Sequence, residues 1–165
     1  MVVSAWPMGE VGSMNRSGHI VVFALDEQRV ALPLSVVERV VRAVEVTPLP
    51  IAWTIVLGAI NFHGQILPVF NLRRRLRLPD REMELSDHII IAKTARRLVA
   101  LVVDAAVGVL ACPEKEIVPP EAIVPGIADL VSGVVKQPNG MIFIHDLDRF
   151  LSLAETQQLE AVLAV

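Results

Sequence analysis

The sequence predicts an all-β protein of two small barrels, with short helices and a final helix. Most apolar runs are short, rich in Val, Ile and Leu, and interrupted by Gly, Pro, Asn or Asp, which is typical of short strands. Gly64 and the run Pro138-Asn139-Gly140 indicate tight turns, because Asn-Gly tolerates the positive φ angles of hairpins. The pattern of residues 58–72 is roughly repeated by residues 133–147. Two similar halves of this size favour small barrels over a sandwich.

Composition narrows the class of protein. The 165 residues are 53% hydrophobic and 20% charged, with a mean hydropathy of +0.56, which excludes a disordered chain. The net charge of −3 argues against a nucleic-acid partner, because such proteins normally carry a basic excess. The most apolar window, residues 98–112, is shorter than the ~20 residues of a membrane span. We therefore expect no membrane insertion, and assign the apolar excess to a core or to a surface that a partner covers.

The first half of the chain reads as strands in sequence. Residues 1–18 are interpreted as a flexible extension, because glycines and a proline recur and no export signal is formed. Residues 19–25 and 29–34 form a predicted hairpin, and residues 35–46 a turn and a further strand. Residues 57–62 and 65–72 flank the turn at Gly64, and residues 73–78 form a short helix.

A polar stretch, residues 79–87, is the predicted boundary between the two barrels. Strands are expected over residues 88–93, 98–109, 130–135 and 141–144, with an irregular proline-rich segment over 112–125. From Leu147 the apolar residues recur with helical period. The domain is therefore expected over 19–151, with a helix over 152–165.

Residues for catalysis are scarce. No phosphate-binding glycine loop, nucleophile elbow or zinc-ligand spacing occurs, so no cofactor or metal is expected. Cys112 precedes a proline in an apolar run and is interpreted as an inert thiol. The group His145, Asp146 and Asp148 is interpreted as a strand end running into a capped helix, with a metal site as the alternative. A small hydrolase using His63, His145 and Asp146 is the enzymatic alternative.

One basic cluster runs from Arg73 to Arg81. It is interpreted as the exposed face of a short helix whose Leu72 and Leu76 point inward. A phosphate or an acidic partner is the alternative ligand.

Four motifs in order resemble the CheW family of bacterial chemotaxis adaptors. Residues 57–73, LGAINFHGQILPVFNLR, resemble the family pattern G-x-I-N-L-R-G-x-x-x-P-V-x-D-L-R. Residues 23–34 resemble the opening hairpin, residues 101–104 the strand that ends V-D, and residues 133–151 the closing segment. The resemblance covers about residues 19–151.

The resemblance implies two SH3-like barrels and an adaptor without catalytic activity. Its implied partners are the cytoplasmic hairpin of a chemoreceptor and the regulatory domain of a CheA-type histidine kinase. The receptor helices are expected in a groove between the barrels. The implied location is cytoplasmic, at the inner face of the membrane through receptor arrays. A scaffold of an auxiliary pathway, such as pilus motility, is the alternative.

Residues carried over from the family divide into two sets. The implied protein-binding residues are Val37, Arg39, Gly58, Asn61, His63, Gly64, Ala106 and Val109. The implied structural residues are Pro68, Asn71, Asp104 and Gly133.

The sequence departs from the family at its contact positions. Arg39 stands where the family has a carboxylate, and His63 where it has an arginine. The change removes an Arg–carboxylate pair, which normally fixes orientation. Asn71 replaces an aspartate, and Gly108 replaces an acidic residue. We therefore expect a divergent member tuned to its own partners.

Overall fold

A computed structural model describes residues 2–4, 9–10, 18–49, 56–122, 131–138 and 140–150. The helix expected over 152–165 lies outside these residues. One group of strands comprises β1 (Val2–Ser4), β3 (His19–Leu25), β4 (Gln28–Pro33), β10 (Ala105–Ala111), β11 (Ile117–Val118), β12 (Val131–Gln137) and β13 (Gly140–His145). The other comprises β2 (Gly9–Glu10), β5 (Val37–Arg42), β6 (Val56–Phe62), β7 (Gln65–Asn71), β8 (His88–Lys93) and β9 (Leu98–Val103).

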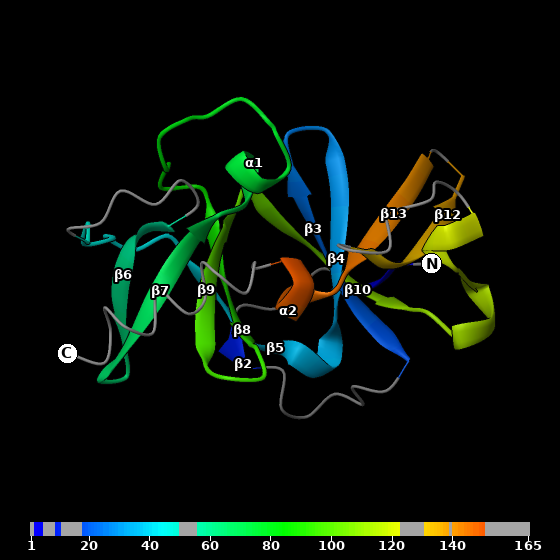
Figure 1. Cartoon of the computed structure of the whole chain (residues 1–165), viewed down its shortest axis with the longest axis horizontal. Helices are drawn as coiled ribbons and strands as arrows, with labels where there is room; N and C mark the ends of the chain where they lie inside the picture. Colours follow the sequence, from blue (N-terminus) through cyan, green and yellow to red (C-terminus); the bar gives the residue numbers. More distant parts are fainter. Residues whose placement is uncertain are drawn as a thin grey trace.

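The short helices are η1 (Leu34–Val36), α1 (Leu72–Arg75), η2 (Glu114–Glu116), η3 (Pro120–Ala122) and α2 (Leu147–Phe150). The strands make two sheets that lie side by side (Figure 1). Sheet A has the order β1-β10-β3-β4-β13-β12-β11, and sheet B the order β2-β5-β8-β9-β7-β6. The all-β prediction with two β subdomains is confirmed.

The two sheets repeat one pattern of pairing. In sheet A the parallel pair is β13 with β4, and in sheet B it is β7 with β9. Each is flanked by antiparallel neighbours, and the hairpins β6–β7 and β12–β13 run into α1 and α2 respectively. The hairpins begin at shifts of register beside Gly58 and Gly133. The two segments that resemble each other in sequence, residues 58–72 and 133–147, therefore also form equivalent hairpins in the two sheets.

The chain crosses between the sheets at places other than the predicted boundary. It enters sheet B after η1 and returns to sheet A between β9 and β10, at Asp104. Residues 79–87 instead connect α1 to β8 within the sheet B half. The boundary expected near residues 79–87 is thus corrected, because polar composition marks a surface loop and not a change of sheet. The predicted strand over residues 98–109 is likewise divided at Asp104.

The extension expected over residues 1–18 contains two paired strands. β1 pairs antiparallel with β10, and β2 pairs antiparallel with β5. The expectation of a loose extension is corrected for these five residues. Their strands are too short to be recognised from alternation of apolar residues.

Three clusters of apolar side chains hold the fold together. One lies within sheet A, from Ile20 to Ile144, and one lies within sheet B, from Ile60 to Ala100. The largest takes residues from both sheets, including Phe23 and Phe70. Central strands are therefore covered on both faces, as near-continuous apolar runs such as 88–92 indicate. None of the described helices is long and apolar enough to cross a membrane.

Candidate functional site

The turn between β6 and β7 positions three of the expected contact residues. Phe62 pairs with Gln65, so His63 and Gly64 are the two turn residues. Their φ angles are +51° and +82°, as a type I′ turn requires. Asn61 Oδ1 accepts a hydrogen bond from Gly64 N at 2.8 Å. The turn presents Asn61, His63 and Gly64 as exposed residues at one end of sheet B.

Arg39 reaches this turn from β5. Its Nη1 lies 2.8 Å from His63 Nε2, and since a guanidinium only donates, Nε2 is the acceptor. The guanidinium carbon lies 5.7 Å from the centre of the Phe62 ring, and the Phe62 and His63 rings meet edge-on at 4.4 Å. At this distance the guanidinium of Arg39 and the ring of Phe62 form a favourable cation–π interaction. Arg39, Asn61, Phe62, His63 and Gly64 are called the Arg39–His63 surface below.

Other expected contact residues lie elsewhere. Val37 and Val109 are 0% exposed, in the cluster between the sheets. The expectation that these side chains face a partner is corrected for this conformation, because both complete the core. Gly58 is also buried, and a Cβ there would collide with the Thr47 carbonyl oxygen and lie 2.8 Å from its carbon. Ala106 is half-buried at the start of β10.

The expected structural residues are mostly buried. Pro68 lies on β7 within sheet B. Asn71 is 6% exposed and caps α1, because its Oδ1 accepts from Arg73 N at 3.0 Å. Its Nδ2 donates to Asp80 Oδ1 at 3.0 Å. Gly133 packs against β11, where a Cβ would collide with the Ile117 Cγ2 methyl.

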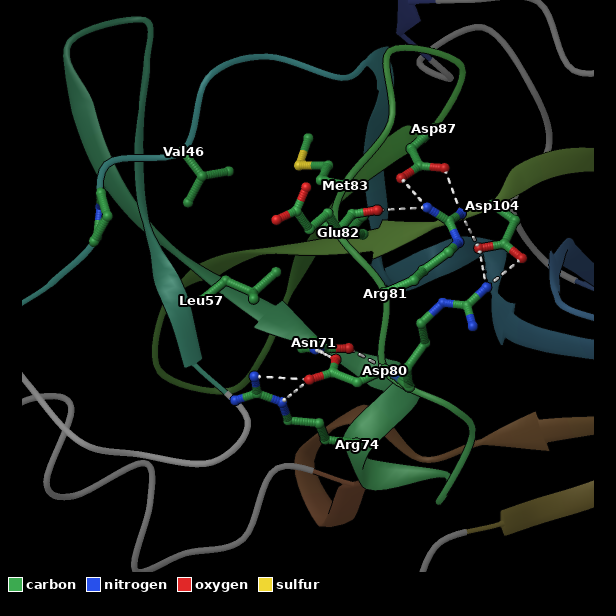
Figure 2. Close-up of a pocket in the computed structure, with 13 residues that line it drawn as sticks. Val46, Leu57, Asn71, Arg74, Asp80, Arg81, Glu82, Met83, Asp87 and Asp104 are labelled. Carbon is green, nitrogen blue, oxygen red and sulfur yellow. Dashed lines mark hydrogen bonds and ion pairs between the residues drawn. The ribbon is translucent and has the colours of Figure 1, made fainter.

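Asp104 is the centre of an ion-pair cluster with Asp26, Arg73, Arg81 and Asp87. Arg73 Nη2 lies 2.6 Å from Asp26 Oδ1 and 2.7 Å from Asp104 Oδ2. Arg81 Nη2 lies 2.7 Å from both Asp104 Oδ1 and Asp87 Oδ1. Figure 2 shows Arg81 between Asp87 and Asp104. The cluster joins the β3–β4 turn, α1, the 79–87 loop and the point where the chain changes sheets.

In this cluster the pKa shifts of Arg73 and Asp104 both favour the charged form of the side chain. Burial disfavours the cation at Arg73, but the hydrogen bonds that it donates to Asp26 and Asp104 outweigh burial and raise the pKa of Arg73. The same competition lowers the pKa of Asp104, where hydrogen bonds from Arg73 and the Asp26 backbone outweigh burial. The cluster borders a hollow of about 650 Å³, whose apolar lining includes Val46, Leu57 and Met83.

The interpretation of the arginine cluster as an exposed face is corrected for Arg73 and Arg81, because Arg81 also pairs with carboxylates within the fold. Arg74 is exposed as expected, and it pairs with Asp80 at 3.0 Å. Arg73 is instead 6% exposed and binds carboxylates within the fold. Sequence reasoning did not identify Asp26 and Asp104 as the partners of Arg73, or Asp87 and Asp104 as those of Arg81. No local signal joins them, because Asp26 is 47 residues from Arg73.

His88 was also missed, although it links the two sheets. Its Nδ1 accepts a hydrogen bond from Ala106 N at 3.2 Å, joining β8 of sheet B to β10 of sheet A. Burial lowers the pKa of His88, the nearby Arg42 lowers it further, and Asp87 opposes both. The ring is thus held neutral with Nδ1 unprotonated.

The residues proposed for catalysis are not assembled. His63 lies in the β6–β7 turn of sheet B, whereas His145 is buried at the end of β13 in sheet A. Burial raises the pKa of the Cys112 thiol. A raised pKa keeps the thiol protonated, which is typical of an inert cysteine. Within the described ranges, no group of three His, Cys, Asp or Glu side chains is placed to hold a metal ion.

Comparison with known proteins supplies the family. Residues 19–155 match the sequence profile of the CheW-like domain. The chain belongs to the CheW-like domain family. As a CheW-like domain it is a non-catalytic scaffold or adaptor of chemotaxis-type signalling, and the hydrolase alternative is wrong.

Three known proteins illustrate the likeness. Chemotaxis protein CheW of Thermotoga maritima is 30% identical over 133 residues, or 78% of this chain and 84% of that protein. Protein FrzA of Myxococcus xanthus is 27% identical over 140 residues, or 85% and 87%. The crystal structure of the scaffolding protein TtCheW from Thermoanaerobacter tengcongensis has a TM-score of 0.75 and 30% identity, and the match covers 84% of this chain and 94% of that chain.

Proposed function

We propose that this chain couples the cytoplasmic hairpin of a chemoreceptor to the regulatory domain of a CheA-type histidine kinase. In this role it lies at the cytoplasmic face of the membrane, held there by the receptor. The observation that carries the proposal is the contact between Arg39 and His63. These residues are 24 positions apart in sequence, and they occupy the positions where the resemblance implies a paired carboxylate and arginine at the partner-binding surface.

The Arg39–His63 surface has the composition of an interaction surface. It combines a guanidinium, an imidazole, an amide and a half-buried aromatic ring. Arginine and aromatic side chains are enriched among the residues that contribute most to protein–protein binding. Strands β5, β6 and β7 hold these groups in place, so little side-chain freedom is lost on binding.

The replacement of the family's charges supports a second, narrower proposal. A partner suited to a carboxylate at position 39 meets a guanidinium here, and such repulsion discriminates between partners. We infer that the chain serves its own receptor and kinase, and the auxiliary pathway, such as pilus motility, is the alternative setting. Binding to an unrelated species' receptor and kinase with equal affinity would contradict this specialisation.

Calorimetric titration tests the main proposal. The chain is titrated with the receptor hairpin and, separately, with the kinase regulatory domain encoded in the same genome. We expect binding to both at about micromolar Kd, which corresponds to roughly −8 kcal/mol. Arg39→Ala should weaken at least one of these interactions about tenfold, a loss of roughly 1.4 kcal/mol.

Arg29→Ala is the matched control, because Arg29 is an exposed arginine on β4 of sheet A. It should leave both affinities unchanged. Well-folded protein that binds neither partner would contradict the proposed function. Equal affinities for the native chain and Arg39→Ala would contradict the role of the Arg39–His63 surface.

A further inference from the structure

The first two strands of the chain lie along equivalent strands of the two sheets. In β1, Val2 is opposite Leu110 and Ser4 is opposite Val109 of β10. In β2, Gly9 is opposite Val40 and Glu10 is opposite Arg39 of β5. The residues of β1 and β2 are called the strap. Without the strap, β10 would be the end strand of sheet A and β5 that of sheet B.

The strap also limits how far apart the two sheet edges are. Five peptide units join Ser4 to Gly9, and a fully extended chain of that length spans at most ~18 Å. The two paired positions therefore lie within about 18 Å of each other. An α-helix with its side chains is about 10–12 Å wide. Because the strap is paired with both edge strands, a helix that lay across the two edges would contact it.

The strands that the strap covers carry the expected contact residues. β5 contains Arg39, which belongs to the Arg39–His63 surface, and Glu10 pairs with it in register. β10 contains Ala106, which is half-buried, and Ser4 of the strap pairs with the neighbouring part of this strand at Val109, whose side chain lies in the core. A helical partner that packed against these strands would meet the strap, because both would occupy the space beside the same two sheet edges.

We propose that the strap is an intramolecular competitor, which occupies the edges of β5 and β10 until the receptor hairpin displaces it. The inference rests on the proposed function, because the competing ligand is the receptor hairpin. A sheet edge pairs readily with any available strand, and here that strand belongs to the chain itself. The strap protects the edges from other chains while the partner is absent.

The strap is suited to displacement because its pairing is short. β1 has three residues with a shift of register between Val2 and Ser4, and β2 has two residues. The pairs β10–β3 and β5–β8, by comparison, extend over most of each strand. The strap is therefore expected to open far more readily than the sheets.

Competition of this kind lowers the affinity by the fraction of molecules in which the strap is open. If the strap covers the edges about 90% of the time, the apparent Kd is raised about tenfold. Removing the strap should then increase affinity for the receptor hairpin by a factor of about three to ten.

The experiment compares three proteins by calorimetry against the receptor hairpin. They are the full chain, a deletion of residues 2–10, and a full-length variant with Val3→Pro and Glu10→Pro, which removes two backbone donors. We expect both altered proteins to bind more tightly than the full chain. A synthetic peptide of residues 1–12, added in excess to the deletion protein, should lower its affinity again. A cooperative unfolding transition in each protein verifies that the sheets are intact.

Hydrogen exchange gives an independent measurement. Saturating the full chain with the receptor hairpin should increase exchange in the strap, residues 2–4 and 9–10. Equal or weaker binding by the deletion protein, or unchanged exchange in these residues, would overturn the inference while leaving the adaptor function in place. If neither the full chain nor the altered proteins bind the receptor hairpin, the proposed function and the inference fail together.

Discussion

Adjacent arginines of α1 have opposite environments. The side chain of Arg73 is 7% exposed and lies between Asp26 and Asp104. The side chain of Arg74 is 40% exposed, and its partner Asp80 is 54% exposed. An ion pair in water contributes little because solvent screens it, whereas removal of one charge from a buried cluster leaves the others uncompensated. The two residues therefore form a natural comparison.

We predict that Arg73→Met destabilises the protein by about 2–3 kcal/mol, somewhat less than a fully buried cluster would show. The reason is that Asp26 then lacks its cation, while Asp104 beside it keeps only its ion pair with Arg81. Arg74→Met should cost at most about 1 kcal/mol. Urea unfolding measures both values. Equal losses for the two variants would show that the cluster contributes no more than a surface pair.

His88 makes stability depend on pH, because burial and the nearby Arg42 disfavour its protonated form in the folded chain. Its folded-state pKa lies below the ordinary value of about 6.5. Above that pH the ring is neutral in both the folded and the unfolded chain, and its contribution is fully present. As the pH falls toward the folded pKa, the unfolded chain binds the proton first, so stability decreases.

We predict that His88→Asn removes this pH dependence. The Asn Oδ1 takes roughly the place of Nδ1, so it keeps an acceptor for Ala106 N but does not titrate. Unfolding free energies of both proteins are measured from pH 7.5 to pH 5. The native chain should lose stability relative to the variant below about pH 6.5. Parallel curves would show that titration of the buried His88 ring contributes nothing to the pH response.

At the scale of the elements, one segment in each sheet covers the outermost strand of a hairpin. In sheet B this segment follows β5 and pairs with β6, and in sheet A it follows β10 and pairs with β12. Thr47 exchanges two backbone hydrogen bonds with Ala59, of 2.9 and 2.8 Å. This bridge ties the segment after β5 to β6. In sheet A, β11 follows β10 and pairs with β12 in the same way. Gly58 and Gly133 allow the two close approaches, because a Cβ at either position would collide with the covering segment.

We predict that Gly58→Ala destabilises the protein by about 1–3 kcal/mol through overpacking against the Thr47 carbonyl. Gly64→Ala is the comparison, because a Cβ at Gly64 meets open space and the cost arises from its φ of +82° alone. Denaturant unfolding gives the two values, and hydrogen exchange at Ala59 reports the bridge. Retained protection of the Ala59 amide in Gly58→Ala would contradict this explanation.

At the scale of the whole molecule, the halves are interleaved. Sheet A takes β3 and β4 from the first part of the chain and β10 to β13 from the last. The largest apolar cluster includes residues of both sheets. A further contact joins α2 to the turn between β8 and β9, where Ala95 N donates a hydrogen bond to Asp148 Oδ1 at 2.9 Å. Neither sheet therefore has a continuous stretch of chain of its own.

We predict that residues 88–165 alone do not fold, although the polar loop before them resembles a domain boundary. That fragment keeps β8 and β9 without β5 and β7, the strands that flank them in sheet B. Circular dichroism during urea unfolding should show no cooperative transition for the fragment, and a single one for the intact chain. A cooperative transition in the fragment would show that the two sheets are separable.

Much of the architecture is local enough to be read from the sequence. The alternation of apolar residues with turn residues predicted most strands within one or two positions, as at residues 19–25 and 88–93. The repeat between residues 58–72 and 133–147 predicted two similar halves. The resemblance to the family brought Arg39 and His63 to one surface, and the contact of 2.8 Å agrees with it.

The remaining features depend on contacts between distant residues. Asp26, Arg73 and Asp104 look like ordinary surface charges in sequence, and only their convergence in the fold makes them an ion-pair cluster around a buried arginine. Val37 and Val109 look available to a partner until the two sheets pack and cover them. Strand order is likewise invisible to local patterns, since parallel pairs such as β13 with β4 join segments about 110 residues apart. The sequence by itself determined the class of fold and the family, because hydrophobic period and turn chemistry act over a few residues. The tertiary structure decided which side chains are buried and which remain available to a partner.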